Sequence, residues 1–486
     1  MRSTITTCVL ASTALFLAFS LPGSAAVLDI TKPPYNAVGD GATDNTAAIN
    51  KALHDAATAT PKDDVIVPPG KFAHSGQINV DGVRFGGADA GMSILVATNP
   101  QSCSINLRGD GPALDNLELD CPTANKRLNC GWQTGVQVTA SHYRVHGIRI
   151  GNATTPGSPS AGIICLGASF GAITGNTIFW SLADAIHMTS GSHDIVVKGN
   201  TILKAGDDMI AVVSYLNNAT PCRNIIIQNN DCLGQTGGRG ITVIGGDHVV
   251  IDHNRIENSS SAGIHLASES SYRTFGPANV TITNNTLKNC DTYEKDCHGS
   301  IFVYGNDLVY NGVKTHFPAK NIIIRGNTIL DAHNNGIRLG DSTENVTIDH
   351  NVINGSEREG IAINIWAPRD DPNGPLNTII TGNDIANTAS DGIFIGPGGR
   401  GSLIINDNAL RDIGKRVPGS DAIAIDSANK GVTSLTISGN KYQNPSGYAS
   451  RGFINCPLSA TAAGTSADKI RSSNFTDTGK PIAAAP

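Results

Sequence analysis

Three aspartates have the spacing of a possible acid–base site. Asp184 occurs in "SLADAIHM", and Asp207 and Asp208 are adjacent in "KAGDDMIAV". Carboxylates that lie close together repel each other, which raises the pKa of at least one of them and leaves a protonated acid beside an ionised base. Cleavage of a glycosidic bond needs that pair of roles. These three aspartates are therefore the candidate catalytic residues.

A structural role for the same aspartates is the competing interpretation. Short polar side chains at chain corners satisfy backbone donors, and an acid or amide begins many similar segments of this chain. The residues at these positions are Asp184, Asp208, Asn335, Glu359, Asp391 and Asp421. Taken singly, each is explained by a turn, so the case for chemistry depends on how the fold brings them together.

An internal repeat predicts that fold. A unit of β-branched residues, a polar residue, Asn and an apolar residue recurs, as in "IVVKGNTI" and "VTIDHNVI". The repeated asparagines are Asn176, Asn200, Asn230, Asn254, Asn285, Asn327, Asn351, Asn383, Asn408 and Asn440. Their shortest spacing, 24 residues, indicates a minimal coil that loops lengthen. A fixed period with a second strand after each Asn predicts an all-β, single-stranded right-handed parallel β-helix, a solenoid in which the Asn column forms a ladder.

The coil period aligns the candidate residues. Asp184 and Asp208 are one minimal coil apart, so we expect them on neighbouring strands about 4.8 Å apart, with Asp207 beside them. Arg239 in "GRG" comes next in the same column. Three residues further along each strand, an outward row would hold His187, Ala211, Thr242 and His265. We expect His187 and His265 to flank a substrate-binding surface and Arg239 to orient the acids or the substrate.

The two ends of the chain have different compositions. Residues 1–26 contain one basic residue, an apolar run and small residues at the end, as in a signal peptide, which predicts a secreted or periplasmic protein. Residues 27–115 should form an N-terminal cap and the first coils. Within them, "DNTAAINKALHDAA" predicts a helix capped by Asp44 or Asn45 that covers the open first coil. Residues 116–460 would form the repeats with the groove, and residues 461–486 a tail.

The net charge and hydropathy of the chain restrict the kinds of molecule that it could bind. The chain has 35 basic and 41 acidic residues, a net charge of −6, which argues against a nucleic-acid partner, and no later segment is apolar enough to span a membrane. One of the ten cysteines lies in the predicted signal. Close spacing favours disulfides that join Cys121 to Cys130, Cys222 to Cys232 and Cys290 to Cys297. No cysteine or histidine spacing fits a structural zinc site.

Two stretches near the N-terminus carry a family resemblance. "YNAVGDGATDNTAAINKAL", followed by "VIVPPGKF", resembles the start of pectate-lyase-like, polygalacturonase-related β-helix proteins. Compared with the polygalacturonase motifs, Asp184, Asp207 and Asp208 match the family's acids. Arg239 stands where its Gly-His-Gly has His, and "HLA" (265–267) replaces its Arg-Ile-Lys. The resemblance implies a glycosidase whose substrate is not plain galacturonan, because the groups that grip the sugar carboxylate are replaced.

Long insertions supply further candidates for substrate binding. They are "ASESSYRTFGPA", "YGNDLVYNGVKTHFPAK" and "NIWAPRDDPNGP", and we expect them to wall one side of a groove. Tyr272, Arg273 and Trp366 lie in them, and aromatic faces and guanidinium groups suit sugar rings and acidic substituents. Packing within the loops would explain the same residues.

Three functions remain open from the sequence. The first is an inverting glycoside hydrolase on a polysaccharide or oligosaccharide, with Asp208 as the acid, Asp184 and Asp207 as the base pair, and no cofactor. The second is a polysaccharide lyase or uronate epimerase, for which calcium would fit the same acids. The third is a carbohydrate-binding β-helix without catalysis. The sugar, the linkage and the oligomeric state are left open.

Overall fold

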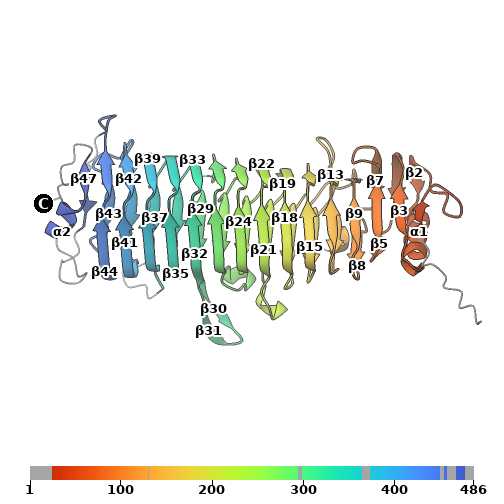
Figure 1. The fold of residues 1–486 in the computed structure, drawn as a ribbon, viewed down its shortest axis with the longest axis horizontal. Helices are drawn as coiled ribbons and strands as arrows, with labels where there is room; N and C mark the ends of the chain where they lie inside the picture. Colours follow the sequence, from red (N-terminus) through yellow and green to blue (C-terminus); the bar gives the residue numbers. More distant parts are fainter. Residues whose placement is uncertain are drawn as a thin grey trace, which may run out of the picture.

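The computed structural model describes residues 25–129, 131–293, 298–363, 373–448, 454–456 and 467–476. In these parts the chain winds into a parallel β-helix whose coils stack along one long axis (Figure 1). Each full coil contributes one strand to each of three sheets, in the order sheet A, sheet B, sheet C. The predicted solenoid is confirmed, with three strands per coil where the sequence indicated at least two.

The strands are distributed as follows. Sheet A contains β1 (Val27–Asp29), β3 (Asp64–Val67), β6 (Arg84–Gly87), β9 (Ala113–Asp115), β12 (Arg144–His146), β15 (Ser169–Thr174), β18 (His193–Lys198), β21 (Arg223–Gln228), β24 (Asp247–Asp252), β27 (Ala278–Thr283), β32 (Ala319–Arg325), β35 (Thr343–Asp349), β38 (Leu376–Thr381), β41 (Arg400–Asn406) and β44 (Gly431–Ser438). Sheet B contains β2 (Asp40–Asp44), β4 (Gly70–His74), β7 (Ser93–Ala97), β10 (Glu118–Asp120), β13 (Arg149–Ile150), β16 (Thr177–Ile178), β19 (Thr201–Ala205), β22 (Asp231–Thr236), β25 (Arg255–Glu257), β28 (Thr286–Lys288), β33 (Thr328–Ala332), β36 (Val352–Ser356), β39 (Asp384–Thr388), β42 (Ala409–Arg411), β45 (Lys441–Gln443) and β47 (Phe475–Thr476). Sheet C contains β5 (Ile78–Asp81), β8 (Ile105–Arg108), β11 (Val136–Val138), β14 (Ile163–Leu166), β17 (Ile186–Thr189), β20 (Ile210–Val213), β23 (Ile241–Ile244), β26 (Ile264–Ala267), β29 (Ile301–Tyr304), β34 (Ile337–Leu339), β37 (Ile361–Ile363), β40 (Ile393–Ile395), β43 (Ile423–Ile425) and β46 (Ile454–Asn455).

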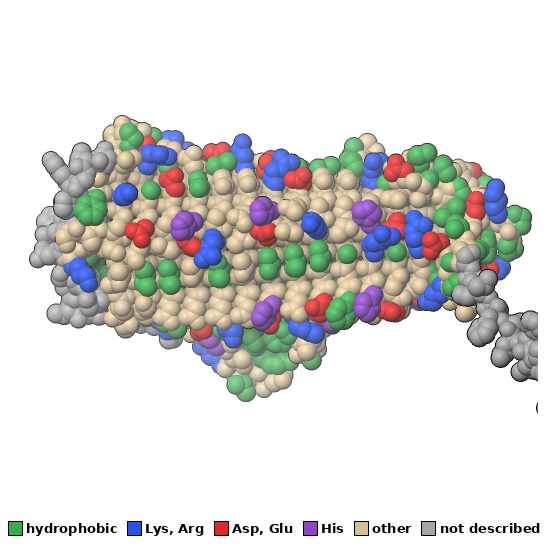
Figure 2. Space-filling model, viewed as in Figure 1, with side chains coloured by type: hydrophobic (Ala, Val, Ile, Leu, Met, Phe, Trp, Pro, Cys, Tyr) green, Lys and Arg blue, Asp and Glu red, His purple; other side chains and the backbone are tan. Residues whose placement is uncertain are grey.

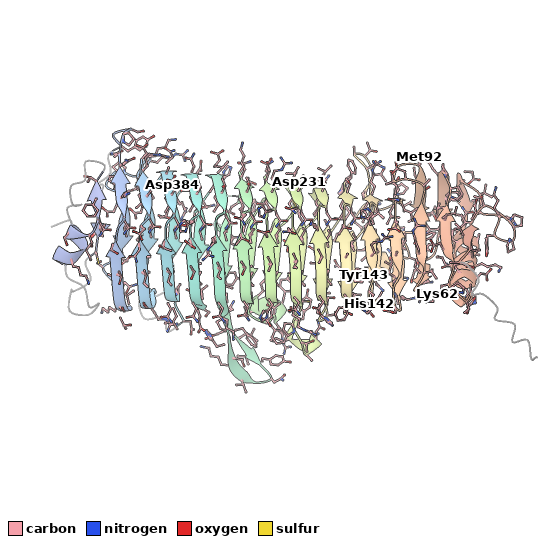
Figure 3. The ribbon with its side chains drawn as sticks, viewed as in Figure 1. Lys62, Met92, His142, Tyr143, Asp231 and Asp384 are labelled. Carbon is pink, nitrogen blue, oxygen red and sulfur yellow. The ribbon has the colours of Figure 1, made fainter. Side chains whose placement is uncertain are left out.

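Stacked aliphatic side chains form the core of the tube. Most strands of sheet C begin with isoleucine, and these isoleucines are buried in register from coil to coil, as in Ile186, Ile210 and Ile241. Because side chains alternate across a strand, the intervening residues face outward and form rows of their own. Figure 2 shows such rows of like side chains running along the long axis of the molecule. Asp231 and Asp384, which begin β22 and β39, lie along the same edge of sheet B (Figure 3).

The asparagine ladder is confirmed and lies inside the turn between sheets A and B. Each side chain donates to the next asparagine, as Asn230 Nδ2 does to Asn254 Oδ1 at 2.9 Å. The same Oδ1 accepts the backbone N–H of Asn230 at 3.0 Å. Asn440 continues the ladder to Asn474, within the segment that the sequence predicted as a tail. β47 also pairs with β45 there, so the β-helix reaches into that segment.

The predicted N-terminal helix is present. α1 (Thr46–Thr58) lies across the N-terminal end of the tube (Figure 1) and contacts β1, β3 and β5. Its buried residues are Ile49, Ala52, Leu53 and Ala56. Asn45 is the N-cap, but the Asp44 carboxylate accepts the backbone N–H of Thr46 at 3.0 Å. α1 therefore covers the open edges of the first coils, as a β-helix end requires.

The insertions gather where the chain passes from sheet C to sheet A. η2 (Leu216–Asn218), η3 (Ser270–Tyr272) and the hairpin β30–β31 (Asn306–Tyr310 and Val313–Phe317) all follow sheet C strands. Figure 1 shows the hairpin projecting from one side of the tube. Two of the three predicted loops therefore lie on one side, while the third falls mostly within residues 364–372, outside the described residues. Two short helices, η1 (Gly131–Gln133) and α2 (Ala467–Ser472), complete the secondary structure of the described residues.

The cysteines differ from the prediction. Cys222 and Cys232 are both buried free thiols, so the predicted disulfide between them is not formed. The difference has a structural reason, since the Cys222 thiol contacts the carbonyl oxygen of Val213 whereas Cys232 lies inside β22. Cys130 and Cys297, the predicted partners of Cys121 and Cys290, lie outside the described residues. In the part of the chain that the structure describes, no helix is both long and apolar enough to cross a membrane.

Candidate active site

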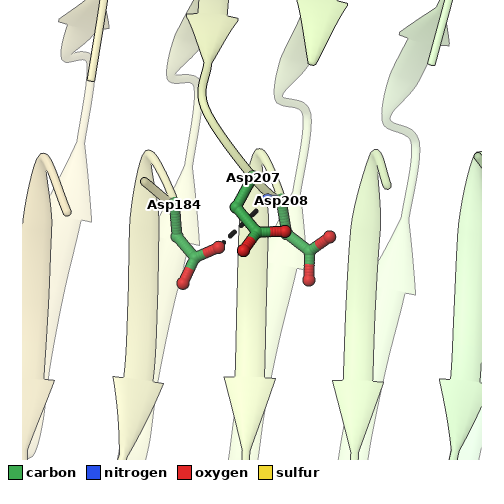
Figure 4. Close-up of side chains that lie close together, drawn as sticks. All are labelled: Asp184, Asp207 and Asp208. Carbon is green, nitrogen blue, oxygen red and sulfur yellow. Dashed lines mark hydrogen bonds between the residues drawn. The ribbon is translucent and has the colours of Figure 1, made fainter. Parts of the chain in front are cut away.

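The three aspartates meet at the turns between sheets B and C (Figure 4). Asp184 lies two residues before β17, and Asp208 lies two residues before β20. These strands are paired in register, Ile186 opposite Ile210, so the two acids stack on neighbouring coils as predicted. One carboxylate oxygen from each of Asp184, Asp207 and Asp208 lies within 4.8 Å of the others. The register of the coils, rather than proximity in sequence, brings Asp184 to the pair.

Part of the structural interpretation is also correct. Asp184 Oδ1 accepts the backbone N–H of Asp208 at 3.0 Å, and Asp208 Oδ1 accepts the backbone N–H of Arg239 at 2.8 Å. The same corner bond recurs far from the site, where Asp391 Oδ1 accepts the backbone N–H of Asp421 at 2.6 Å. Each of these aspartates, at the turn between sheets B and C, therefore accepts a backbone N–H of the next coil with one carboxylate oxygen. This role accounts for Oδ1 of Asp184 and of Asp208, and it leaves their second oxygens to be explained.

Arg239 grips Asp208 as a fork. Its Nε donates to Oδ1 at 2.8 Å and its Nη2 to Oδ2 at 2.9 Å, while its Nη1 donates to Glu269 Oε1 at 2.7 Å. Burial lowers the pKa of Arg239, but Asp208 and Glu269 outweigh burial and raise it above the ordinary value. A guanidinium fork of this geometry pairs with an ionised carboxylate. Asp208 is only 3% exposed, so the pair is shielded from solvent.

Asp184 pairs with His187 from the outward row of β17. His187 Nδ1 lies 2.6 Å from Asp184 Oδ2. Burial raises the pKa of Asp184, yet the hydrogen bond and charge of His187 outweigh it and lower the pKa below its ordinary value. Burial likewise lowers the pKa of His187, but Asp184 raises it above the ordinary value. The two groups thus favour an ionised carboxylate beside a protonated imidazole.

The pKa of Asp207 is shifted in the opposite direction to that of Asp184. Burial, followed by the charges of Asp208 and Asp184, raises the pKa of Asp207, although Arg127 Nη1 donates to its Oδ2 at 2.7 Å and lowers it in part. The Asp207 side chain is 33% exposed, more than those of Asp184 and Asp208 at 12% and 4%. Neighbouring acids with divergent pKa values are the usual arrangement of an acid–base pair. In this cluster Asp207 is the group whose pKa is raised and whose side chain is the most exposed.

A cation could approach these acids only by changing their present contacts. Carboxylate oxygens within 4.8 Å of one another are hard ligands of the kind that Ca²⁺ prefers. However, Asp184, Asp207 and Asp208 already accept hydrogen bonds from His187, Arg127 and Arg239 in that order. The donor set is chemically suitable for calcium, but its negative charge is largely balanced by these side chains.

The outward row that the sequence predicted on sheet C has the expected register, but its side chains are less exposed to solvent than a substrate-binding surface would require. His187, Ala211, Thr242 and His265 align on β17, β20, β23 and β26. His265 is 2% exposed, and burial followed by the charge of Arg239 lowers its pKa well below the ordinary value. Its ring packs against His298, Phe302 and Tyr304. The prediction that His265 flanks a substrate-binding surface is therefore not supported, because His265 is buried and aromatic rings cover it.

The remaining predicted binding residues lie around the loops. Tyr272 in η3 is 65% exposed, and the Arg273 guanidinium lies 5.4 Å from the centre of the Tyr310 ring. Trp366 falls outside the described residues. Tyr272 is thus available to a ligand, whereas Arg273 is partly engaged within its own loop region.

Three residues near the acids were missed by sequence reasoning. Arg127 comes from the loop after β10, Glu269 from the loop after β26, and Tyr215 follows β20. Burial and the charges of Asp184 and Glu269 raise the pKa of Tyr215, which places it near both. A signal for Glu269 existed in its position within the predicted wall, "ASESSYRTFGPA". Nothing in the sequence indicated that Arg127, 80 residues before Asp207, would reach it.

The comparisons with known proteins agree with this architecture. The family model described as right handed beta helix region matches residues 123–276, which include all three aspartates. The chain therefore has the fold of a right-handed parallel β-helix. Its likeness to polygalacturonases in particular stays a prediction from the resemblance.

Solved β-helix structures extend the comparison. The A-module of the Azotobacter vinelandii mannuronan C-5 epimerase AlgE6 has 18% identity and a TM-score of 0.54, over 74% of this chain and 99% of that one. The catalytic unit of a thermostable GH87 α-1,3-glucanase from Streptomyces thermodiastaticus strain HF3-3 has 14% identity and a TM-score of 0.53, over 89% and 70%. The pre-mature gene product 12 of bacteriophage phi29 has 16% identity and a TM-score of 0.59, over 90% and 57%. At these identities the β-helix protein shares a fold with all three.

Proposed function

We propose that this β-helix protein is a polysaccharide-acting glycoside hydrolase whose catalytic groups are Asp184, Asp207 and Asp208. The observation that carries the proposal is the meeting of three carboxylates within 4.8 Å at one pair of neighbouring coils. The hydrogen bonds to the backbone of the next coil explain one oxygen of each stacked acid, but they do not explain why Asp207 lies beside two like charges. A purely structural turn gains nothing from that repulsion.

The glucanase structures support the same assignment. Two structures of a GH87 α-1,3-glucanase catalytic domain, each with 18% identity to this chain, carry a single aspartate-to-alanine substitution. One is in complex with nigerose and the other with tetrasaccharides, and the two substituted positions differ by 23 in that protein's numbering. Asp184 and Asp207 also differ by 23. The match favours a role for these two acids in saccharide chemistry on the same fold.

The geometry changes the roles that the sequence suggested. The sequence suggested Asp208 as the acid. However, Asp208 accepts two hydrogen bonds from the Arg239 guanidinium, an arrangement that favours the carboxylate form. We therefore assign the acid role to Asp207. Protonated Asp207 gives its proton to the glycosidic oxygen as the bond to the anomeric carbon breaks. A water molecule attacks that carbon and loses its proton to Asp184, which His187 keeps ionised before the reaction. After the products leave, Asp207 regains a proton from solvent through its exposed side, and Asp184 releases to solvent the proton that it took from water.

Inversion of the anomeric carbon fits this arrangement. Retaining enzymes place their carboxyl groups about 5–5.5 Å apart and inverting enzymes about 6.5–9.5 Å apart, so the short spacing alone points to retention. A covalent intermediate, however, needs a carboxylate oxygen that the sugar can reach, and the side chains of Asp184 and Asp208 are 12% and 4% exposed. Water reaches such groups more easily than a sugar ring. We therefore keep inversion as part of the proposal, and proton NMR of the first-formed product anomer tests it.

A lyase or epimerase reaction on a uronate polymer is the second candidate. The specific observation in its favour is the donor set for a calcium ion, together with the likeness in fold to a mannuronan C-5 epimerase. Arg127 and Arg239 could neutralise a substrate carboxylate only by releasing Asp207 and Asp208. Loss of activity with a chelator, restored by Ca²⁺, would favour this candidate. We also infer from residues 1–26 that the protein acts outside the cytoplasm.

One product assay separates the candidates. The chain without residues 1–26 is incubated with neutral and acidic polysaccharides, and reducing ends and the ultraviolet absorbance of unsaturated uronates are followed together. New reducing ends without that absorbance, lost in Asp207→Asn, establish hydrolysis. Matching absorbance establishes a lyase, and inverted uronate residues without chain cleavage establish an epimerase. Retarded migration in polysaccharide gels without any product would instead establish a binding protein.

A further inference from the structure

Two cysteines share a small buried cluster beside the candidate active site. Cys103 lies between β7 and β8, and Cys121 directly follows β10. They are 5% and 0% exposed, and together with Ala97 and Ala124 they form a cluster that is separate from the main core. The two thiols are hydrogen-bonded to each other, and this bond lowers the pKa of Cys121 and raises the pKa of Cys103. Thiols in direct contact need little movement to form a disulfide.

The cluster contacts both ends of the segment that carries Arg127. This segment, which we call the Arg127 loop, begins at Cys121 after β10 and leads into β11. Near its far end, the Cys103 thiol contacts the carbonyl oxygen of Thr134 at 3.4 Å. Between these two points, Arg127 Nη1 donates to Asp207 Oδ2 at 2.7 Å. Cys103 therefore lies where the two ends of the Arg127 loop meet, and Arg127 reaches the candidate active site from there.

The same cluster contacts the turn that carries Asp184. Leu182, which is partly buried, packs against it and lies two residues before Asp184. The cluster is thus linked to Asp184 through Leu182 and to Asp207 through the Arg127 loop. A covalent bond inside the cluster would therefore restrain the surroundings of two of the three aspartates.

We propose that a disulfide joins Cys103 to Cys121 and holds the Arg127 loop beside the candidate active site. This pairing differs from that of Cys121 with Cys130, which close spacing in the sequence favoured, because the fold brings Cys103 into contact with Cys121 from the preceding coil. The disulfide makes the position of Arg127 depend on the redox state of the two cysteines. The link stands apart from the proposed function, and only its effect on the pH profile rests on that function.

Joining the two thiols, which are both free in the structure, needs an oxidant. The oxidant is a second disulfide, that of oxidised glutathione or of a thiol–disulfide oxidoreductase outside the cytoplasm. One cysteine, as its thiolate, attacks a sulfur of that disulfide, and the other sulfur leaves as a thiolate. The second cysteine then loses its proton and displaces the attached sulfur. The protein gives up two electrons and two protons, and the oxidant becomes two thiols. Because both cysteines are buried in the folded chain, this exchange takes place during folding.

Peptide mapping tests the link without any need for turnover. The chain without residues 1–26 is exported from a host cell on a host signal peptide, unfolded, alkylated at its free thiols and digested with trypsin without reduction. Trypsin places the cysteines in three separate peptides, Cys103 in residues 85–108, Cys121 in residues 109–126 and Cys130 in residues 128–144. We expect the first two peptides to be linked to each other. A link from either of them to any other peptide, or alkylation of both Cys103 and Cys121, overturns the inference.

Limited proteolysis tests whether the link holds the Arg127 loop. The same chain made in the reducing cytoplasm of the host should contain two thiols in place of the disulfide. We expect trypsin to cleave this native reduced protein after Arg127 about tenfold faster than the exported protein, because the loop opens more often. Cys121→Ala should give both preparations the faster rate, whereas Cys232→Ala, which removes an equally buried thiol from β22, should preserve the difference. Equal rates for the two wild-type preparations overturn the role of the disulfide, whether or not the variants fold.

Kinetics separate this inference from the proposed function. Arg127 lowers the pKa of Asp207, so the reduced protein should show the alkaline limb of kcat/KM at higher pH than the exported protein. In Arg127→Gln the two preparations should have the same limb, because both changes act through one contact. If the peptides are linked but no polysaccharide is cleaved, the hydrolase is wrong while the disulfide stands. If the enzyme is active and both cysteines are alkylated, the disulfide is wrong while the hydrolase stands.

Discussion

At the scale of single residues, the three aspartates have two kinds of role. Asp184 and Asp208 accept backbone hydrogen bonds from the next coil, and Asp207 is the proposed proton donor. Asp208 is buried, forms a fork with Arg239 and also accepts the backbone of the next coil. Asp207 makes one salt bridge to a half-exposed arginine and retains a raised pKa. Substitution of the two aspartates should therefore have different consequences.

Asp207→Asn should lower kcat by about 10²–10⁴-fold with little change in stability, because it removes a partly exposed proton donor. Asp208→Asn should abolish turnover and also destabilise the fold by about 3–5 kcal/mol, since it leaves Arg239, whose side chain is only 19% exposed, with less charge compensation. Rates on the polymer and urea unfolding curves measure the two effects. Asp115→Asn is the matched control, because Asp115 is 2% exposed and pairs with Arg84 and Arg144 on sheet A. It should lose stability but not activity, and equal loss of activity in all three variants would refute the role assignment.

The pH profile should depend on Arg127. An acid catalyst acts while protonated, so the alkaline limb of kcat/KM falls as pH rises through the raised pKa of Asp207. A base acts while ionised, so the acid limb falls as pH drops through the lowered pKa of Asp184. Arg127 lowers the pKa of Asp207, and Arg127→Gln should therefore shift the alkaline limb to higher pH. Arg144→Gln, which removes a half-exposed arginine from Asp115, should leave both limbs in place. An unmoved limb in Arg127→Gln would exclude Asp207 as the titrating acid.

At the scale of the elements, the asparagine ladder sets the spacing on which the site depends. Asn254 donates from Nδ2 to the Ile227 carbonyl and to Asn285, and accepts from Asn230. All of these groups are buried, so their satisfaction is a condition for regular coils.

Asn254→Ala should destabilise the protein by about 2–4 kcal/mol, because it leaves buried donors and acceptors without partners. Asn354→Ala is the matched control, since Asn354 is an exposed strand residue that accepts from Asn387 on the next coil. Thermal unfolding of both variants measures the difference. If the two variants lost similar amounts of unfolding free energy, the asparagine ladder would not make the predicted contribution to stability.

The elements also show why the sequence predicts some parts of the molecule and not others. The Asn column and the strand pattern predict the coils and the stacking of Asp184 on Asp208, because register in a solenoid follows from the period. Exposure does not follow from the period, so the covering of His265 by His298 and Tyr304 could not be predicted. Neither could the reach of Arg127, because a loop of irregular length has no register. The pairing of Cys222 with Cys232 failed for a related reason, since proximity in sequence is a weak guide where neighbouring residues belong to different faces of a tube.

At the scale of the whole molecule, each coil is stabilised by pairing with its neighbours, and the first and last coils lack a neighbour on one side. β1 is the first strand of sheet A, β2 of sheet B and β5 of sheet C, and α1 lies over this end. Without the helix, these strand edges would be open to pairing with another chain.

Leu53→Asp should release α1 and cause concentration-dependent association, because a charge replaces a side chain that is 1% exposed against the first coils. His54→Asp places the same charge at the next, exposed position of α1 and should leave the protein unchanged. Light scattering coupled to size-exclusion chromatography measures the outcome. A monodisperse Leu53→Asp protein of unchanged size would show that α1 does not protect this end.

The nearest-neighbour pairing of the coils makes length an adjustable property of the molecule. In the described parts of the chain each strand of the three sheets pairs with the strand of the coil before it or after it, and the shortest coil is one 24-residue repeat. Inserting or deleting one such repeat between β26 and β37 would move the coils on its two sides apart or together by a single increment of about 4.8 Å. The length of the outward face of sheet C is therefore graduated in whole coils.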